Sequence, residues 1–408
     1  MNAPASRAVI TGLGVVAPTG TDVEAHWQAT LAGKSAIHHI DRFDTSGYPL
    51  KLFGDVRDFV ATDHVPVRLV RETDLMTHLA FAATEQALAD AGLDPATVPE
   101  FDLGVVTANS SGGAHFGQSE LQKLYSEGPY AVGAYMSIAW FYAATTGQLS
   151  IRHGARGACG VIATEQAGGL DAFGQARRNL RKGGRAVLCG GTDASLTPYG
   201  LVAQLANGLL SQRDDPLRAY LPFDADASGY VSGEGGAIMV VEDADAARAR
   251  GVDRFLAEVA GYAATFDPRQ QTRREPGLRR AIELALADAQ VRPQDVDVVF
   301  ADGYGVPRLD LVEAQALMRT FGERGVPVTV PKTMTGRLYA GGAPLDVATA
   351  VLAMRDSVIP PTVNVTSLAP GCRIDLVRDE PREAQLRTVL VAARGHGGFN
   401  AALVLTHP

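Results

Sequence analysis

Two similar nine-residue sequences occur in this chain of 408 residues. Residues 87–95 read ALADAGLDP, and residues 285–293 read ALADAQVRP. Each copy ends a stretch with helical spacing of apolar residues and leads shortly to an apolar segment with the pattern of a strand. Two such units about 200 residues apart predict two related halves, joined near the charged, alanine-rich segment 243–254. Chance is the alternative explanation, because alanine-rich helix ends are common.

The rest of the chain alternates short β-rich runs with amphipathic helical patterns, which is typical of a layered α/β protein with buried sheets. We expect two domains, residues 1–253 and 254–408, which pack as one body because no low-complexity linker separates them. The expected strands are 8–11, 103–108, 185–189, 237–242, 296–301, 388–393 and 401–406. The expected helices are 76–91, 165–180, 277–289, 311–321 and 345–354.

The charge balance and apolar runs exclude several classes of protein. A net charge of −8, from 37 Lys and Arg against 45 Asp and Glu, disfavours nonspecific binding to nucleic acid or anionic membranes. No apolar run reaches the roughly 18 to 20 residues of a membrane span, and the first residues lack the apolar core of a signal peptide. We therefore expect a cytoplasmic protein with no nucleic-acid or membrane partner. Cys159, Cys189 and Cys372 are too widely spaced for a zinc ribbon, so we expect no metal.

A glycine pair near the start of the chain matches part of the dinucleotide-binding fingerprint. Gly12 and Gly14 follow an expected strand, but Pro18 and Gly20 would break the helix that has to open at the glycines. No acidic residue ends a clear second strand about 20 residues later. A structural turn at the strand end is the favoured interpretation, and an NAD-binding oxidoreductase is an alternative.

A second motif lies at the expected start of a helix, in residues 160–172 (GVIATEQAGGLDA). The small residues after Gln166 would let other backbone approach the helix start, where the helix dipole favours a negative charge. A cysteine at such a corner would be acidified and nucleophilic. Gln166 is a neutral amide that cannot attack a thioester. An ordinary helix start with an exposed glutamine is the alternative interpretation.

Together with residues 220–224 (YLPFD), 229–236 (GYVSGEGG) and 397–400 (GGFN), this corner resembles the β-ketoacyl synthases of the thiolase fold. The TEQAGGLDA form of the corner is similar to the chain-length factors, the ketosynthase β subunits of type II aromatic polyketide synthases. The resemblance extends from Arg7 to about Leu405. It implies a five-layer αβαβα sandwich made of two duplicated halves, each containing βαβ units.

The resemblance also shows which catalytic groups of the family are missing. Gln166 stands at the cysteine position, and Asp302 and Arg337 stand at the positions of the two histidines, whereas Lys332 and the gate-like Phe399 are retained. No histidine occurs between positions 153 and 396, so none nearby can substitute. We predict an ion pair between Asp302 and Arg337, because either charge alone would be costly to bury. Gln166 is either structural or assists decarboxylation of a malonyl carrier.

The sequence AHFGQSEL at residues 114–121 predicts a helix with Ala114, Gly117 and Leu121 on one face. In the family, the matching face lines the distal end of the polyketide tunnel, together with the position of Ile138. These residues are small or aliphatic, which implies a long tunnel. A close contact between helices, permitted by the small side chains, is the alternative.

The resemblance therefore implies a subunit without condensing activity that pairs with a catalytic ketosynthase and sets the chain length of the product, at about a decaketide or longer. A carrier protein would deliver the polyketide intermediate on its own phosphopantetheine, so no cofactor of this chain is expected. Whether the chain is itself an enzyme is left open. The alternatives are an active β-ketoacyl synthase or acyltransferase that uses Cys159 or another nucleophile, and the oxidoreductase.

Overall fold

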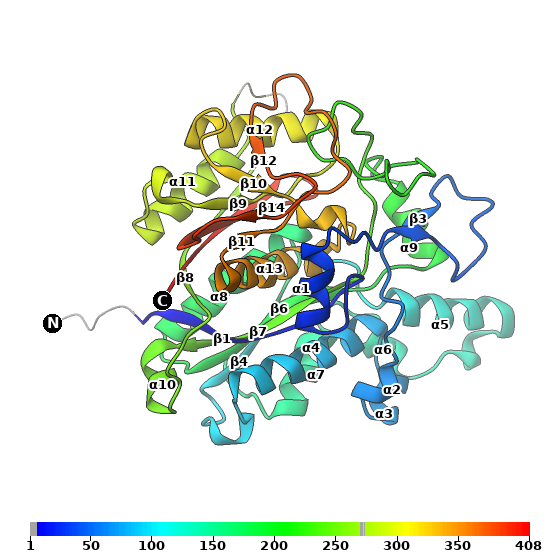
Figure 1. The fold of residues 1–408 in the computed structure, drawn as a ribbon. Helices are drawn as coiled ribbons and strands as arrows, with labels where there is room; N and C mark the ends of the chain where they lie inside the picture. The colour runs from blue at the N-terminus through cyan, green and yellow to red at the C-terminus, as the bar shows by residue number, and fades with distance from the viewer. Residues whose placement is uncertain (1–5, 270–271, 273) are drawn as a thin grey trace.

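Eleven strands form one mixed sheet through both halves of the computed structural model, which describes residues 6–269, 272 and 274–408 (Figure 1). Their order across the sheet is β12-β10-β9-β14-β15-β8-β1-β7-β6-β4-β5. The strands are β1 (Ala8–Val16), β4 (Leu103–Ala108), β5 (Cys159–Ile162), β6 (Ala186–Asp193), β7 (Gly235–Asp243), β8 (Ala257–Phe266), β9 (Val298–Phe300), β10 (Pro327–Thr329), β12 (Asp375–Leu376), β14 (Thr388–Gly395) and β15 (Phe399–Thr406).

The two halves repeat the same topology. The N-terminal strands run in the order β1-β7-β6-β4-β5 and the C-terminal strands in the order β8-β15-β14-β9-β10. In both series the first two pairings are antiparallel and the next two parallel. The series meet where β1 pairs with β8 at two positions, Val9 with Glu258 and Ile10 with Ala257. The predicted duplication is confirmed, and the domain boundary at residues 253 and 254 stays a prediction.

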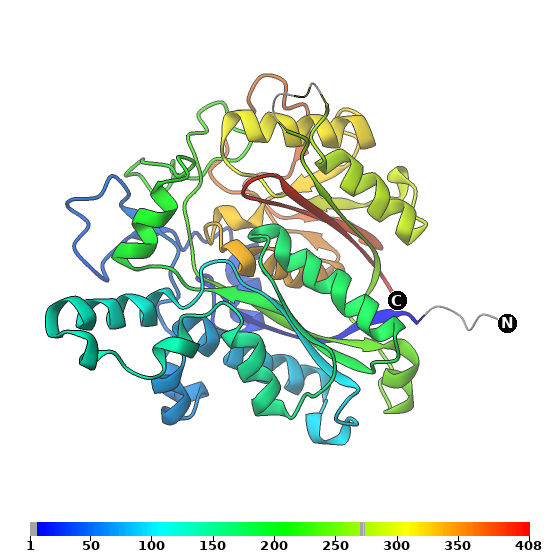
Figure 2. The same ribbon diagram turned by 180° about the vertical axis from the view of Figure 1, so that it is seen from behind.

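Helices cover and separate the two halves of the sheet. Figures 1 and 2 show α11 and α12 on one outer side, α4 and α7 on the other, and α8 and α13 in the middle, which gives five layers. Helix α13 is buried from its first residue to Met354 because it is enclosed between the sheet halves. The helices are α1 (Val23–Leu31), α2 (Ala61–His64), α3 (Val67–Glu72), α4 (Leu75–Ala91), α5 (Ala114–Glu127), α6 (Met136–Ala139), α7 (Ala144–His153), α8 (Gln166–Arg181), α9 (Pro198–Leu205), α10 (Ala244–Ala249), α11 (Leu278–Ala289), α12 (Pro307–Phe321) and α13 (Gly342–Asp356).

The repeated sequence ends α4 and α11, and its aspartate makes the same contact in both halves. The backbone N–H of Leu13 donates to Asp90 at 3.0 Å, and that of Tyr262 donates to Asp288 at 2.9 Å. Each carboxylate therefore ties the last turn of a helix to the neighbouring strand. We call this contact the helix-strand clamp.

Glycines in β1 and β8 allow these helices to approach the strands. A Cβ atom at Gly12 would lie 2.2 Å from the carbonyl oxygen of Ala87, and one at Gly261 would lie 2.2 Å from that of Ala285. One at Gly14 would lie 1.9 Å from the carbonyl oxygen of the α4 residue Ala83. Since Gly12 and Gly14 are both packed against α4, they leave no room for a nucleotide.

Several elements differ from the sequence prediction. Strand β1 continues through Gly12 and Gly14 to Val16, so the expected turn at the strand end is wrong. Strands β5, β8, β10 and β12 are absent from the expected strands, and β8 alternates buried and partly exposed residues, which gives it no continuous apolar run. Helix α13 begins at Gly342 and α12 at Pro307, a few residues before the expected starts.

Among the described residues, no helix combines the length and the apolarity that crossing a bilayer requires. The cytoplasmic location stays a prediction.

The glycine contacts predict a large difference between two glycine-to-alanine substitutions. Gly14→Ala should lower the free energy of unfolding by at least about 1–3 kcal/mol, because its methyl group would overlap a backbone oxygen that cannot move independently. Gly147→Ala in α7 is the matched control: nothing lies within 4 Å of its added Cβ, so stability should be unchanged or rise by up to about 1 kcal/mol. Denaturant unfolding of both variants measures the difference, and equal stabilities would contradict the packing role of Gly14.

Candidate functional site

The corner between β5 and α8 has an unusual backbone conformation. Glu165, directly before the first helical residue, has φ 54° and ψ −136°, a region sparsely populated by residues with a side chain. Its carboxylate accepts hydrogen bonds from the backbone N–H of His396 at 2.7 Å and from Nε of Arg337 at 3.4 Å. Two groups from the C-terminal half therefore hold the corner in place.

Gln166 begins α8 and points into the protein interior. Its exposed fraction is 0%, so the alternative of an exposed glutamine is wrong. Its side-chain Nε2 donates to Oδ1 of Asp302 at 2.7 Å. Within the described part of the chain, its Oε1 has no hydrogen-bond partner. Because the amide N–H is used within the protein, Gln166 is directed at Asp302 and away from solvent.

Asp302 and Arg337 form the expected ion pair. Nη1 of Arg337 lies 3.0 Å from Oδ2 of Asp302, and both side chains are 0% exposed. Burial opposes the charge on Arg337, but Asp302 and the other nearby acidic groups hold its pKa well above the ordinary value. Gln166, Asp302 and Arg337 thus form one buried network, which we call the Gln-Asp-Arg cluster.

Aromatic rings and a carbonyl group complete the surroundings of the arginine. The guanidinium carbon of Arg337 lies 3.8 Å from the ring centre of Tyr304 and 5.6 Å from that of Tyr230. Its Nη2 donates to the backbone oxygen of Arg394 at the end of β14. A buried cation over aromatic faces is favoured by the electrostatic attraction of the rings. Every side of the guanidinium is therefore occupied by protein groups.

Glu313 of α12 orients Asp302 from behind. Its two carboxylate oxygens accept the backbone N–H groups of Asp302 at 2.7 Å and Gly303 at 2.9 Å. Burial, reinforced by the charge of Asp302, raises the pKa of Glu313 to about 7. The sequence analysis missed Glu313. Its only signal was a pair of acidic residues, Asp310 and Glu313, three positions apart on a helix face that also carries Ala314 and Leu317.

Lys332 supports the same strand end from the other side. Its Nζ donates to the carbonyl oxygen of Ala301 at 2.8 Å and lies 2.7 Å from the carboxylate of Asp346 in α13. Burial raises the pKa of Asp346 to about 6, although the charge of Lys332 opposes that shift. The retained lysine therefore acts on the residue before Asp302, and its functional role stays a prediction.

Phe399 lies at the start of β15, beside the corner. Its ring centre is 5.0 Å from that of Phe266, at an interplanar angle of 78°. Gly395 lies between the corner and this ring, because an added Cβ would be 2.2 Å from the oxygen of Thr164 and 3.1 Å from Cβ of Phe399. Phe399 is partly buried, and Phe266 is exposed. The gate role of Phe399 stays a prediction.

The four expected tunnel residues lie on α5 and α6, away from the Gln-Asp-Arg cluster in the sequence but close to one another. Ala114 is buried, Gly117 and Leu121 are partly buried, and Ile138 is 46% exposed. The two segments touch, because an added Cβ at Gly117 would lie 3.7 Å from Cβ of Trp140. Their tunnel role stays a prediction.

The cysteines do not form a second catalytic centre in the described structure. Cys159 is exposed on β5, seven positions before Gln166, whereas Cys189 and Cys372 are buried. Burial raises the pKa of both buried thiols, which keeps them protonated. Across the described residues, no group of three or more His, Cys, Asp or Glu side chains is arranged to hold a metal ion.

Comparison with known proteins agrees with this architecture. The family described as β-ketoacyl synthase, N-terminal domain, matches residues 5–247, and its C-terminal domain matches residues 256–366. The tetracenomycin polyketide synthase ketoacyl synthase beta subunit of Streptomyces glaucescens is 58% identical over 99% of both chains. Among solved structures, the ishigamide ketosynthase/chain length factor has a TM-score of 0.91 at 29% identity, with 99% of this chain and 100% of that chain covered.

A second solved structure is a type II polyketide synthase acyl-carrier protein in complex with its ketosynthase bound to the hexaketide. It has a TM-score of 0.88 at 26% identity and covers 99% of this chain and 100% of that chain. The chain belongs to the β-ketoacyl synthase family. Within that family it is a ketosynthase β subunit, or chain-length factor, of the type II aromatic polyketide synthase class.

The buried ion pair predicts an asymmetric response to substitution. Arg337→Met should lower the free energy of unfolding by about 3–5 kcal/mol, because it leaves the carboxylate of Asp302 uncompensated in the interior. The double variant with Asp302→Asn should recover part of that loss. Arg292→Met is the control: its partner Asp295 is exposed, so the change should cost far less stability than Arg337→Met. Denaturant unfolding compares the variants, and equal losses for Arg337→Met and Arg292→Met would contradict the role of burial.

Proposed function

We propose that this chain is the non-condensing partner of a catalytic ketosynthase and that it sets the length of the polyketide, at about a decaketide or longer. The observation that carries the proposal is the Gln-Asp-Arg cluster. Three positions that hold the cysteine and two histidines in condensing relatives are occupied by side chains that bond one another and have no exposed surface. A thioester would find no cysteine or histidine among the three, and none of them has a surface exposed to solvent.

The same geometry favours a structural role for Gln166 over assistance in decarboxylation. A glutamine could polarise a thioester carbonyl only through its side-chain N–H groups. One N–H of Nε2 of Gln166 already donates to Asp302, and the side chain has no exposed surface. Acyl transfer through another nucleophile has weaker support. The exposed Cys159 lies on an edge strand, outside the helix start that would acidify a thiol.

An exposed sheet edge and a group of aromatic residues support the proposal of a partner. Strand β5 pairs only with β4 and ends the sheet, so one side of its backbone is open for pairing with another chain. The segment 130–142, between α5 and α7, exposes several large apolar side chains. Contiguous apolar surface of this kind marks interaction sites. The exposed side chains are Tyr130, Tyr135, Ile138, Trp140, Phe141 and Tyr142.

The occupant proposed for this surface is a catalytic ketosynthase with the same fold. A carrier protein is the second proposed partner, and it would bring the growing chain on its phosphopantetheine. Relatives of both kinds support the assignment, since the ishigamide neighbour pairs a ketosynthase with a chain length factor, and the other neighbour pairs a carrier protein with its ketosynthase.

The proposed function predicts that the chain alone has no condensing activity. The purified chain should form no covalent acyl adduct and no condensation product when it is incubated with a malonyl carrier protein and an acyl carrier protein. Intact-protein mass spectrometry detects the adduct, and product analysis detects condensation. Gln166→Cys alone should also remain without condensation activity, because Asp302 and Arg337 still occupy the histidine positions. Condensation by the unaltered chain would refute the proposal.

The second prediction concerns assembly. Co-expression with its ketosynthase should give a stable one-to-one complex, and Trp140→Asp should weaken that complex by placing a charge in an apolar interface. Leu284→Asp is the matched control, since Leu284 is also an exposed apolar residue but lies on α11, far from β5 in the sheet order. Size-exclusion chromatography with light scattering measures the stoichiometry. A complex that tolerates Trp140→Asp as well as Leu284→Asp would argue against this interface.

The third prediction concerns chain length. Gly117→Phe should shorten the main product without preventing assembly, because the ring would fill space between α5 and Trp140. An overpacking penalty of about 1–3 kcal/mol corresponds to a shift in product partition of roughly 5- to 150-fold. Gln122→Phe, on the exposed side of the same helix, should leave the product unchanged. Mass spectrometry of the polyketides from co-expressed complexes compares the product lengths of the two variants. Unchanged length in an assembled Gly117→Phe complex would mean that this face only packs.

A further inference from the structure

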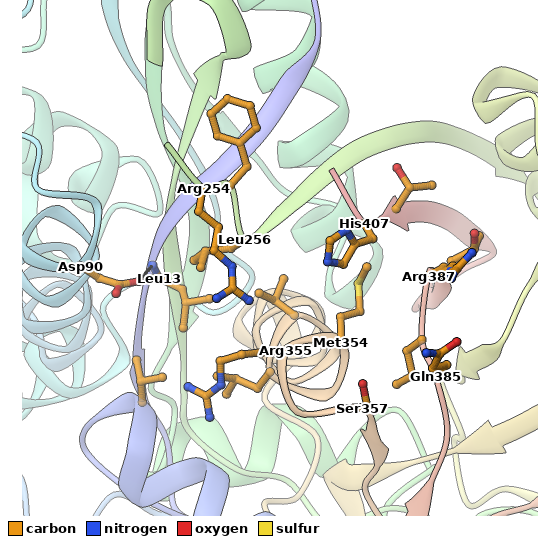
Figure 3. A pocket seen from close by; sticks show the side chains of 17 residues that line it. Leu13, Asp90, Arg254, Leu256, Met354, Arg355, Ser357, Gln385, Arg387 and His407 are labelled. Carbon is orange, nitrogen blue, oxygen red and sulfur yellow. Dashed lines mark hydrogen bonds between the residues drawn. The ribbon is translucent and has the colours of Figure 1, made fainter. Parts of the chain in front are cut away.

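A cavity of about 840 Å³ lies between the two halves, at the carboxyl end of α13 (Figure 3). It is lined from both halves: Leu13 belongs to β1, Arg254 and Leu256 to the segment before β8, and Met354 to the last turn of α13. Its volume falls within the range of about 300–1,000 Å³ that is typical of small-molecule sites. None of the proposed functional residues lines it.

The cavity combines an apolar floor with a cationic rim. Leu13, Leu352 and Leu386 are buried side chains that contribute to the floor. Arg254 and Arg387 are exposed at the rim, on two separate segments of the chain, and Figure 3 shows them around the same space. Such a surface suits a ligand with an apolar body and one anionic end.

The two rim arginines differ from a third one in the same cavity. Arg355 lies 2.7 Å from Asp356 and 3.6 Å from Glu24, so its charge is already balanced. Within the described residues, Arg254 and Arg387 have no carboxylate at ion-pair distance. A guanidinium group presents paired N–H donors that match the two oxygens of a carboxylate. Arg254 and Arg387 therefore supply the uncompensated charge of the rim.

The remaining groups of the cavity disfavour a ligand with a second negative charge. Asp90 lines one side, and the last carbonyl groups of α13 give the helix end a partial negative charge. Both would repel a dianion such as a phosphate monoester more strongly than a monoanion. We propose that this cavity binds an amphipathic monocarboxylate, with its apolar body on the floor and its carboxylate at one of the two rim arginines, Arg254 or Arg387.

This site is independent of the proposed function. Helix α13 begins beside Gln166, since an added Cβ at Gly342 would lie 2.7 Å from Oε1 of that residue, and it ends at the cavity. Its 15 residues, at about 1.5 Å each, put roughly 20 Å between the cavity and the Gln-Asp-Arg cluster. Binding in the cavity can therefore be tested without any polyketide reaction.

The test is isothermal titration calorimetry of the full-length chain with dodecanoate and with 2-naphthoate, which represent an aliphatic and an aromatic body. At least one should bind, and the tighter of the two identifies the body that the floor prefers. Dodecyl phosphate and dodecanol should bind at least tenfold more weakly than dodecanoate. If neither carboxylate binds, or if the phosphate or the alcohol binds as tightly, the proposal is overturned.

Variants locate the binding site. Arg254→Gln combined with Arg387→Gln should raise the Kd of the better ligand at least tenfold, and Leu256→Trp should weaken binding by narrowing the cavity. Arg308→Gln, an exposed arginine on α12 outside the cavity, should leave the Kd unchanged. Circular dichroism checks that each variant is folded. If Leu256→Trp is unfolded, the double arginine variant decides, and an unchanged Kd in that variant overturns the proposal.

Discussion

The buried ion pair between Asp302 and Arg337 constrains the whole centre of the molecule. Two opposite charges with no exposed surface have to balance each other, and the other oxygen and the backbone N–H of Asp302 are bonded as well. Gln166 takes the second oxygen of Asp302, and Glu313 takes the backbone N–H behind it. These groups come from α8, α12 and the segments after β9 and β10, so the pair joins both halves. Such a pair is seldom a large source of stability compared with apolar side chains.

The sequence predicted the duplicated fold because the residues of the repeat make the same structural contact in each half. The aspartate of each copy has to reach a strand N–H, and the glycines opposite have to lack a Cβ, so these residues identify the same unit twice. Strand β8 was missed because the sequence signal of a strand with one partly exposed face is weak. Strand β1 was expected too short because Gly12 and Gly14 were interpreted as a turn, whereas their lack of side chains serves packing against α4.

The sequence analysis predicted which residues form the site but only some of the contacts that surround them. The pairing of Asp302 with Arg337 follows from charge and burial, and it is present. The hydrogen bond from Gln166 to Asp302 was not foreseen, since the two residues are 136 positions apart in the sequence. Glu313, Tyr304 and Arg394 were missed for the same reason: each contributes through a contact between elements that local spacing does not reveal.

The helix-strand clamps have the same backbone geometry in both halves, but the pKa values of their two carboxyl groups are shifted in opposite directions. Burial raises the pKa of Asp90 above its ordinary value. Burial acts in the same direction on Asp288, but the hydrogen bond and charge of Arg177 outweigh it and lower the pKa of that carboxyl. Acidification from neutral pH therefore discharges the N-terminal clamp before the C-terminal one. The two copies of the repeat therefore make the same contact with carboxyl groups that become neutral at different pH, and the carboxyl group of the half that carries α4 does so first.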